Sequence, residues 1–278
     1  MSTITCLGQN WDNSVQPAPP AVAAPPAPSS DYNSNYWVSQ NAAVTSDGEL
    51  QLSVQRNSGE KWHGFECWAA GQAVLQIPSG QMLAYGTYLV TFYPVGGWAD
   101  FSGGNTASGQ NTSTTFGVFI FDPQAPDAPC PFNEIDIVEV GYQNQTSADA
   151  WINQGDVANS NAQFCVQPWD GTTPGTPDWN QVNRVAMSPT DKVTFVANWQ
   201  SGSVTFYAAA GDFSSDNFPY SDPNTISWTP PSSTTIPAPT QTMSLYINCW
   251  PYGGPSTNNS VFFNVSRVEV PMAAIPAQ

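Results

Sequence analysis

Residues Phe132–Gly141 read FNEIDIVEVG, and this stretch sets three carboxylates inside a run of β-branched residues. A β-strand alternates its side chains between two faces, so Glu134 and Asp136 lie on one face and the isoleucines lie on the other. Glu139 has the opposite parity and would face the core, where an unpaired carboxylate is strongly disfavoured. We therefore predict a β-bulge near residues 137–138 that returns Glu139 to the acidic face.

Three carboxyl groups on one face define a particular chemistry. Like charges held close together cannot all ionise at their ordinary pKa, so at least one group keeps its proton. A carboxylate beside a carboxylic acid is the pair that glycosidases use, one as nucleophile or base and the other as proton donor to the leaving oxygen. The alternatives are an acidic patch on an exposed strand and half of a calcium site, although calcium loops more often take their ligands from irregular backbone.

The run EIDIVE followed by Val140-Gly141 resembles the catalytic signature of glycoside hydrolase family 16, in the bulged form of its laminarinase-like members. Three further stretches of the family pattern follow in the expected order, at residues 84–88, 193–207 and 243–251. The resemblance covers roughly residues 36–271. One departure is the strand YGTYLVTFY, which carries Thr and Leu where the family usually has charged residues.

This resemblance implies a retaining endo-glycosidase. It assigns Glu134 as the nucleophile, Glu139 as the general acid and then base, and Asp136 as the group between them that tunes both. The implied fold is a concanavalin A-like jelly roll, with an open cleft on its concave sheet. In the family an aspartate of the final strand often binds a structural calcium ion; the corresponding residue here is Asn264, so we name no cofactor and no metal ligand and leave a structural calcium ion open.

The residue pattern independently predicts an all-β chain, an antiparallel β-sandwich. Helical periodicity is nearly absent, whereas turn formers, including 26 prolines and 21 glycines, separate short β-branched or aromatic runs. We expect one sandwich domain over residues 31–278, preceded by a Pro/Ala-rich arm or linker at residues 1–30. The clearest expected strands lie at residues 36–38, 49–54, 85–93, 116–121, 193–199, 203–209, 243–251 and 261–270.

Charge restricts the partners of the chain. With 5 basic against 21 acidic residues, the formal net charge is −16. Nucleic acids and heavily sulfated polysaccharides need Lys and Arg to neutralise their charge, so this balance argues against both. No apolar run is long enough to span a bilayer. A neutral polysaccharide fits best, and the resemblance implies a β-1,3-glucan or a mixed-linkage glucan as substrate. We expect a monomer. The alternative function is a glycan-binding, lectin-like protein without turnover.

Aromatic and amide side chains are the expected sugar contacts, because sugar rings stack on aromatic faces and amides orient hydroxyl groups. The candidates are Trp62, Trp68, Trp98, Trp151, Asn153 and Trp250. His63, the one histidine, is either a surface residue or a contact to substrate.

The cysteines and the N-terminus leave the compartment open. The five cysteines include no CxxC pair, which argues against zinc, and each could be a buried thiol or part of a disulfide. No basic segment followed by an apolar core opens the chain, so a secretory signal is either lacking or removed. The glycosidase interpretation favours a secreted protein, and a cytoplasmic start remains an alternative.

Overall fold

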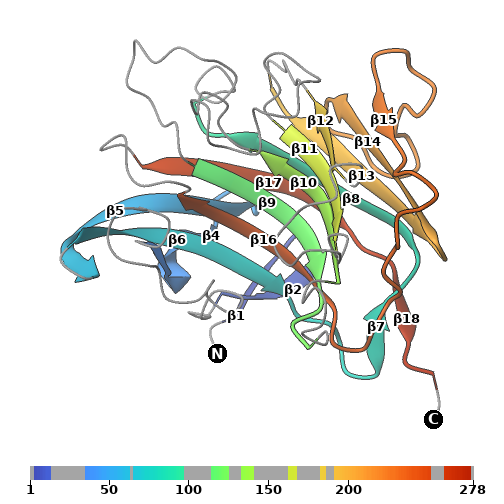
Figure 1. The fold of residues 1–278 in the computed structure, drawn as a ribbon. Helices are drawn as coiled ribbons and strands as arrows, with labels where there is room; N and C mark the ends of the chain where they lie inside the picture. The colour runs from blue at the N-terminus through green and yellow to red at the C-terminus, as the bar shows by residue number, and fades with distance from the viewer. Residues whose placement is uncertain are drawn as a thin grey trace.

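The protein is a two-layer β-sandwich in the computed structural model (Figure 1). The structure describes residues 3–13, 35–62, 65–96, 114–124, 133–140, 162–167, 182–185, 191–251 and 260–276. Within these ranges the one helical element is a 3-10 turn, η1 (Ser39–Asn41), so no described helix is long and apolar enough to cross a membrane.

One layer, which we call the acidic sheet, carries the EIDIVE strand. Its strand order is β12-β11-β10-β9-β16-β6, and a hairpin of β1 and β2 continues it beyond β6. The bounds are β1 (Thr3–Cys6), β2 (Gln9–Asp12), β6 (Phe65–Leu75), β9 (Thr114–Phe121), β10 (Glu134–Val140), β11 (Ala162–Gln167), β12 (Val182–Val185) and β16 (Ser244–Pro251).

The other layer, which we call the outer sheet, has the order β5-β17-β8-β13-β14-β15, with β4 beside β5. The bounds are β4 (Ala42–Val44), β5 (Leu50–Trp62), β8 (Gly86–Pro94), β13 (Val193–Gln200), β14 (Ser203–Ala210), β15 (Ile226–Trp228) and β17 (Val261–Glu269). Strand β5 belongs to both layers, because its first half pairs with β17 and its second half pairs with β6.

The core lies between the two sheets and is rich in phenylalanine. Phe116 of β9 packs against Phe92 of β8 and Phe263 of β17, with ring centroids 4.5 Å apart in both pairs. Phe195 of β13 stacks on Phe92 at 5.4 Å. All four rings are completely buried. Because Phe116 belongs to the acidic sheet and the other three to the outer sheet, these contacts hold the layers together and fix the position of β9 beside the acids.

The expected strands are all present, with two differences from the sequence-based picture. One strand pair is parallel, between β3 (Asn35–Trp37) and β6; the remaining pairs, including β7 (Gln81–Leu83) with β18 (Met272–Ala274), are antiparallel. The predicted N-terminal arm does not hold for residues 3–12, which form the β1–β2 hairpin. Trp11 is fully buried there and donates from Nε1 to the carbonyl of Cys6, so this hairpin belongs to the sandwich. The Pro17–Pro28 segment lies outside the described residues.

Candidate active site

Strand β10 carries the predicted bulge. Asp136 pairs with Phe119 of β9, but the next pair is Val138 with Val118, so Ile137 has no partner on β9. Pairing with β11 shifts in the same interval, between Asp136 and Glu139. Ile137 and Val138 are therefore both buried in the core, and Glu139 returns to the face of Asp136. The inference drawn from the parity of Glu139 is confirmed.

Asp136 lies at the centre of a short chain of hydrogen bonds. Its side chain is almost fully buried, and it hydrogen-bonds to the Glu134 carboxyl group. Cys165, directly opposite Asp136 on β11, also hydrogen-bonds to it. The bond with Asp136 lowers the pKa of Glu134, so this contact favours the ionised form of Glu134. The bond raises the pKa of Cys165, so the thiol donates to Asp136.

Glu134 nevertheless binds a proton more tightly than a carboxyl group in water. Burial is the largest cause and raises its pKa from 4.5 to about 8; the hydrogen bond with Asp136 opposes this shift, and the charge of Glu139 adds to it. The prediction that one acid keeps its proton fits Glu134, but the main cause is burial, and the charge of the neighbouring Glu139 contributes least. Acids this close titrate together, so a measured pKa describes the set of three carboxyl groups rather than one residue.

Glu139 has a dedicated partner on the neighbouring strand. Gln163 of β11 is paired with Glu139, and its Nε2 donates to Glu139 Oε2 at 2.5 Å. This hydrogen bond fixes the direction in which the carboxyl group of Glu139 points. Gln163 is buried, and its own Oε1 has no hydrogen-bond partner.

Aromatic rings line the acidic face on the side of β9 and β16. Phe119, opposite Asp136, stacks on Tyr246 with ring centroids 5.3 Å apart, and Phe121 meets Tyr246 edge-on at 5.7 Å. Burial, with the charges of Asp122 and Glu134, raises the pKa of Tyr246 to about 12. Tyr246 is therefore a neutral phenol at physiological pH, and it supplies a half-buried ring beside Glu134.

The structure places one of the predicted sugar contacts. Trp250 is half-buried on β16, on the same face as Asn248, and its strand position is opposite Thr115. Trp62 ends β5 and Trp68 lies in β6, the antiparallel neighbour of β5; their side chains lie outside what the structure describes. Trp98, Trp151, Asn153 and His63 lie outside the described residues, as do the segments 97–113 and 141–161, so the open cleft stays a prediction.

Calcium, which the resemblance associates with the position of Asn264, does not fit the donors found there. Asn264 Oδ1 accepts from Gln51 at 2.8 Å, and its Nδ2 donates to Glu49 at 3.2 Å. The Lys192 ammonium lies 3.4 Å from the Glu49 carboxylate and therefore already supplies the cation. Calcium takes about six to eight oxygen ligands, many of them carboxylates, whereas the described residues contain no group of three or more His, Cys, Asp or Glu side chains that could hold a metal ion.

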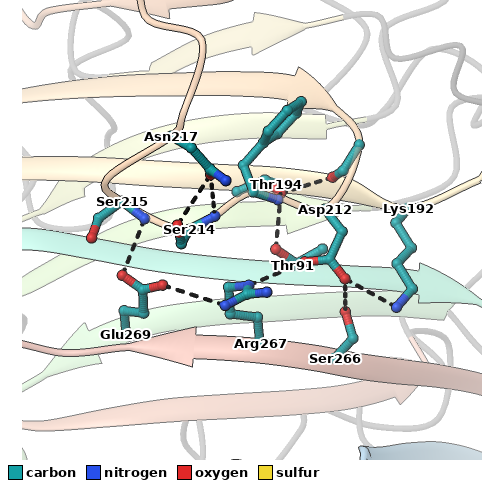
Figure 2. A network of polar contacts seen from close by, with 12 residues as sticks. Thr91, Lys192, Thr194, Asp212, Ser214, Ser215, Asn217, Ser266, Arg267 and Glu269 are labelled. Atoms are coloured by element: carbon teal, nitrogen blue, oxygen red, sulfur yellow. Dashed lines mark hydrogen bonds and ion pairs between the residues drawn. The ribbon is translucent and has the colours of Figure 1, made fainter.

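Lys192 belongs to a wider network on the outer sheet (Figure 2). Asp212 accepts from both Lys192 and Arg267, at 3.1 Å each. Arg267 also lies 3.8 Å from Glu269, which accepts from the backbone of Ser215. These contacts tie the segment after β14 to strand β17. The network is structural, because it uses the face of the sandwich that does not carry the three acids.

Comparison with known proteins supports the fold. The sequence matches no model of a known protein family and no curated protein. Among solved structures, the catalytic domain of an endo-1,3-beta-glucanase (laminarinase) from Thermotoga petrophila superposes with a TM-score of 0.56 at 12% identity, covering 98% of this chain and 94% of that chain. A family 16 glycoside hydrolase of the Bacteroides ovatus mixed-linkage glucan system, solved with a G4G4G3G product, gives 0.54 at 12%, covering 94% of each chain.

A β-glucanase from Bacillus licheniformis gives a TM-score of 0.52 at 16% identity, covering 94% of this chain and 91% of that chain. The predicted jelly-roll sandwich is thus confirmed: this chain has the fold of the family 16 glucanases. At these identities the likeness concerns the fold, and the chemistry has to be argued from the side chains.

Sequence reasoning missed several residues of the acidic face. These are Gln163, Cys165, Tyr246, Asn248 and Gln72. A signal existed in β16, where SLYINCWP alternates, so that the core residues Leu245, Ile247 and Cys249 leave Tyr246 and Asn248 on the other face. No comparable signal predicts which residue of β11 meets which acid, because that depends on the register across the intervening segment.

Proposed function

We propose that this protein is a retaining endo-glycosidase that hydrolyses a neutral β-linked glucan, with 1,3 or mixed 1,3-1,4 linkages. The observation that carries the proposal is the bulged strand, which aligns Glu134, Asp136 and Glu139 on one face of a sheet. The glucanase fold supports the same class of reaction. Because a polysaccharide is too large to enter a cell, we include secretion in the proposal. We also propose that the enzyme acts as a monomer.

In this mechanism Glu134 attacks the anomeric carbon and Glu139 protonates the leaving oxygen, after which Glu139 takes a proton from the water that releases the sugar. The reactive form therefore has Glu134 ionised and Glu139 protonated. In the free protein burial raises the pKa of Glu134 and so favours its protonated form. Positive charge develops on the sugar ring in the transition state, and this charge together with the hydrogen bond with Asp136 stabilises the Glu134 anion.

Azide rescue tests whether Glu134 is the nucleophile and Glu139 the acid/base, or whether the two roles are exchanged. Glu134→Gln is expected to lower turnover by several orders of magnitude while substrate binding and thermal stability are retained. Azide added to Glu134→Ala attacks the sugar from the vacated face and gives a glycosyl azide of inverted configuration. Azide added to Glu139→Ala attacks the glycosyl-enzyme and gives the retained configuration.

The assay uses laminarin and mixed-linkage β-glucan for the wild type and Glu134→Ala, and a glucan oligosaccharide with a nitrophenyl leaving group, which departs as the phenolate without a proton, for Glu139→Ala; product configuration is read by NMR. A retained product from Glu134→Ala and an inverted product from Glu139→Ala would show that Glu139 is the nucleophile and Glu134 the acid/base. Binding of glucan by the wild type without any turnover would replace the enzyme with the lectin-like alternative.

A further inference from the structure

One row of paired residues crosses the acidic sheet through Glu139. Gln163 of β11 pairs with Glu139, Glu139 pairs with Gly117 of β9, Gly117 pairs with Asn248 of β16, and Asn248 pairs with Gln72 of β6. Residues paired directly across strands project to the same face. Three amide side chains, Gln163, Asn248 and Gln72, therefore share the face of the three acids, and we call them the amide row.

Each amide of this row is more than nine-tenths buried, with 8%, 6% and 4% of Gln163, Asn248 and Gln72 exposed. The side-chain oxygen of each is buried without a hydrogen-bond partner. For Gln163 the orientation is determined, because its Nε2 donates to Glu139 and leaves Oε1 as the free acceptor. A buried acceptor without a donor destabilises a fold, so three in one row indicate a function.

Gly117 has no side chain, and the Asn248 amide uses the space beside it. A Cβ atom at Gly117 would lie 2.9 Å from Asn248 Oδ1, so a residue with a side chain at this position would displace the amide. Neighbouring strands are about 4.8 Å apart, which puts Asn248 roughly 10 Å and Gln72 roughly 14 Å from Glu139 along the row. That span exceeds one sugar ring.

We propose that the amide row is a binding subsite that accepts hydrogen bonds from the hydroxyl groups of at least two consecutive sugars, and that it selects unsubstituted rings. A carbonyl oxygen needs a donor, which a hydroxyl group provides and a sulfate or carboxylate substituent does not. Terminal amides turn about a soft torsion, so an arriving hydroxyl group can meet these oxygens. This inference rests on the proposed glucanase function.

The test removes the acceptors and keeps the side-chain volume. Asn248→Leu and Gln72→Leu are each expected to raise KM for a neutral β-glucan about three- to tenfold, with kcat nearly unchanged. Both variants should keep or raise the melting temperature, because an unsatisfied acceptor is lost. Gln76→Leu is the matched control: this glutamine follows β6 and already donates to Thr3 at 3.0 Å, so its KM should equal that of the wild type.

Selectivity provides the second measurement, with the same glucan in neutral and carboxymethylated form. The wild type should prefer the neutral polymer, and Asn248→Leu should reduce this preference. If the wild type hydrolyses the glucan and both variants keep its KM and preference, the amide row has no binding role while the proposed function stands.

If the wild type shows no hydrolysis, the proposed function fails, and the row is tested by calorimetric titration with laminarin oligosaccharides. Weaker binding by the two variants than by Gln76→Leu supports the subsite. Equal binding, or no binding to the wild type, overturns it.

Discussion

Glu134 keeps its proton to a higher pH than a carboxyl group in water, and this links folding to pH. Its pKa rises from 4.5 to about 8, mainly through burial. Below pH 4.5 both the folded and the unfolded chain hold the proton. Between pH 4.5 and about 8 the unfolded chain releases it while the folded chain retains it, so stability is lost as the pH rises.

We therefore expect the free energy of unfolding of the wild type to fall across this window by at most about 1.4 kcal/mol per pH unit relative to Glu134→Gln. Urea titrations at half-unit pH intervals measure the difference. Parallel curves for the two proteins would mean that Glu134 titrates normally in the folded state.

Cys165 is a second residue whose behaviour follows from its surroundings. Burial, together with the charges of Asp136, Glu139 and Glu134, raises its pKa well above the ordinary value. Because the thiolate is the reactive form, Cys165 should remain unmodified by iodoacetamide in the native protein at pH 8 and react fully once unfolded. Cys249, buried in the core, serves as the internal control, since burial alone raises its pKa. Peptide mapping by mass spectrometry reads both, and native alkylation of Cys165 would contradict its burial.

At the scale of the strand, the bulge in β10 makes a deletion test possible. Ile137 has no partner on β9, so its removal leaves Asp136 opposite Phe119 and Glu139 opposite Gly117. We expect a variant lacking Ile137 to fold and keep measurable hydrolysis. It should lose about 2–5 kcal/mol of stability, because a buried isoleucine is gone.

The matched control lacks Ile135 instead, which pairs with both Ile120 and Val166. That deletion moves Glu134 to the core face and should abolish folding or activity. Circular dichroism and a reducing-sugar assay compare the two variants. Equal damage by both deletions would show that β10 does not absorb Ile137 as a bulge.

The same strand shows what sequence reasoning can and cannot reach. Parity alone predicts the bulge, since Glu139 would otherwise be buried, and the residue pattern predicts the strands that short runs of β-branched and aromatic residues form, such as β13 and β14. The contact between Gln163 and Glu139 depends on the register of β11, which no local pattern specifies. The hairpin of β1 and β2 was missed because residues 3–12 are short and polar; its one large anchor, Trp11, gains its burial from β6.

The ammonium group of Lys192 lies beside strand β17, at the place where the family resemblance suggests a calcium ion. Lys192 lies 3.4 Å from Glu49 and 3.1 Å from Asp212. Lys192→Met should leave the partly buried Glu49 without its cation and Asp212 with Arg267 as its remaining cationic partner, and should cost about 1–2 kcal/mol, a value discounted for solvent exposure. A chelator such as EDTA should leave the melting temperature of the wild type unchanged.

Differential scanning fluorimetry with EDTA or excess calcium measures both effects, and Lys61→Met is the control for loss of one positive charge. A fall in the wild-type melting temperature with EDTA would show that a metal ion is held despite these contacts. Equal stability of Lys192→Met and Lys61→Met would show that the cation is dispensable.

At the scale of the whole molecule, the net charge of −16 creates a field that acts on any charged polymer. Two of the five basic residues, Lys192 and Arg267, are engaged in ion pairs on the outer sheet. The acidic face presents Glu134, Asp136 and Glu139. A sulfated glucan therefore approaches against repulsion, whereas a neutral glucan meets no electrostatic cost.

Salt weakens the long-range repulsion but not the hydrogen bonds of the amide row, so the salt dependence of the rates distinguishes the two effects. The Debye length shrinks from about 30 Å at 0.01 M salt to about 10 Å at 0.1 M, so salt weakens repulsion by the whole molecule but leaves short contacts intact. We expect the preference in kcat/KM for neutral over sulfated glucan to decrease as salt rises and then level off above one, with the residual preference due to local acceptors. Initial rates on matched polymers at five salt concentrations measure both parts. Faster turnover of the sulfated polymer at low salt would contradict the argument and point to a local cation, for which Arg184, paired with Gln163, is the first candidate.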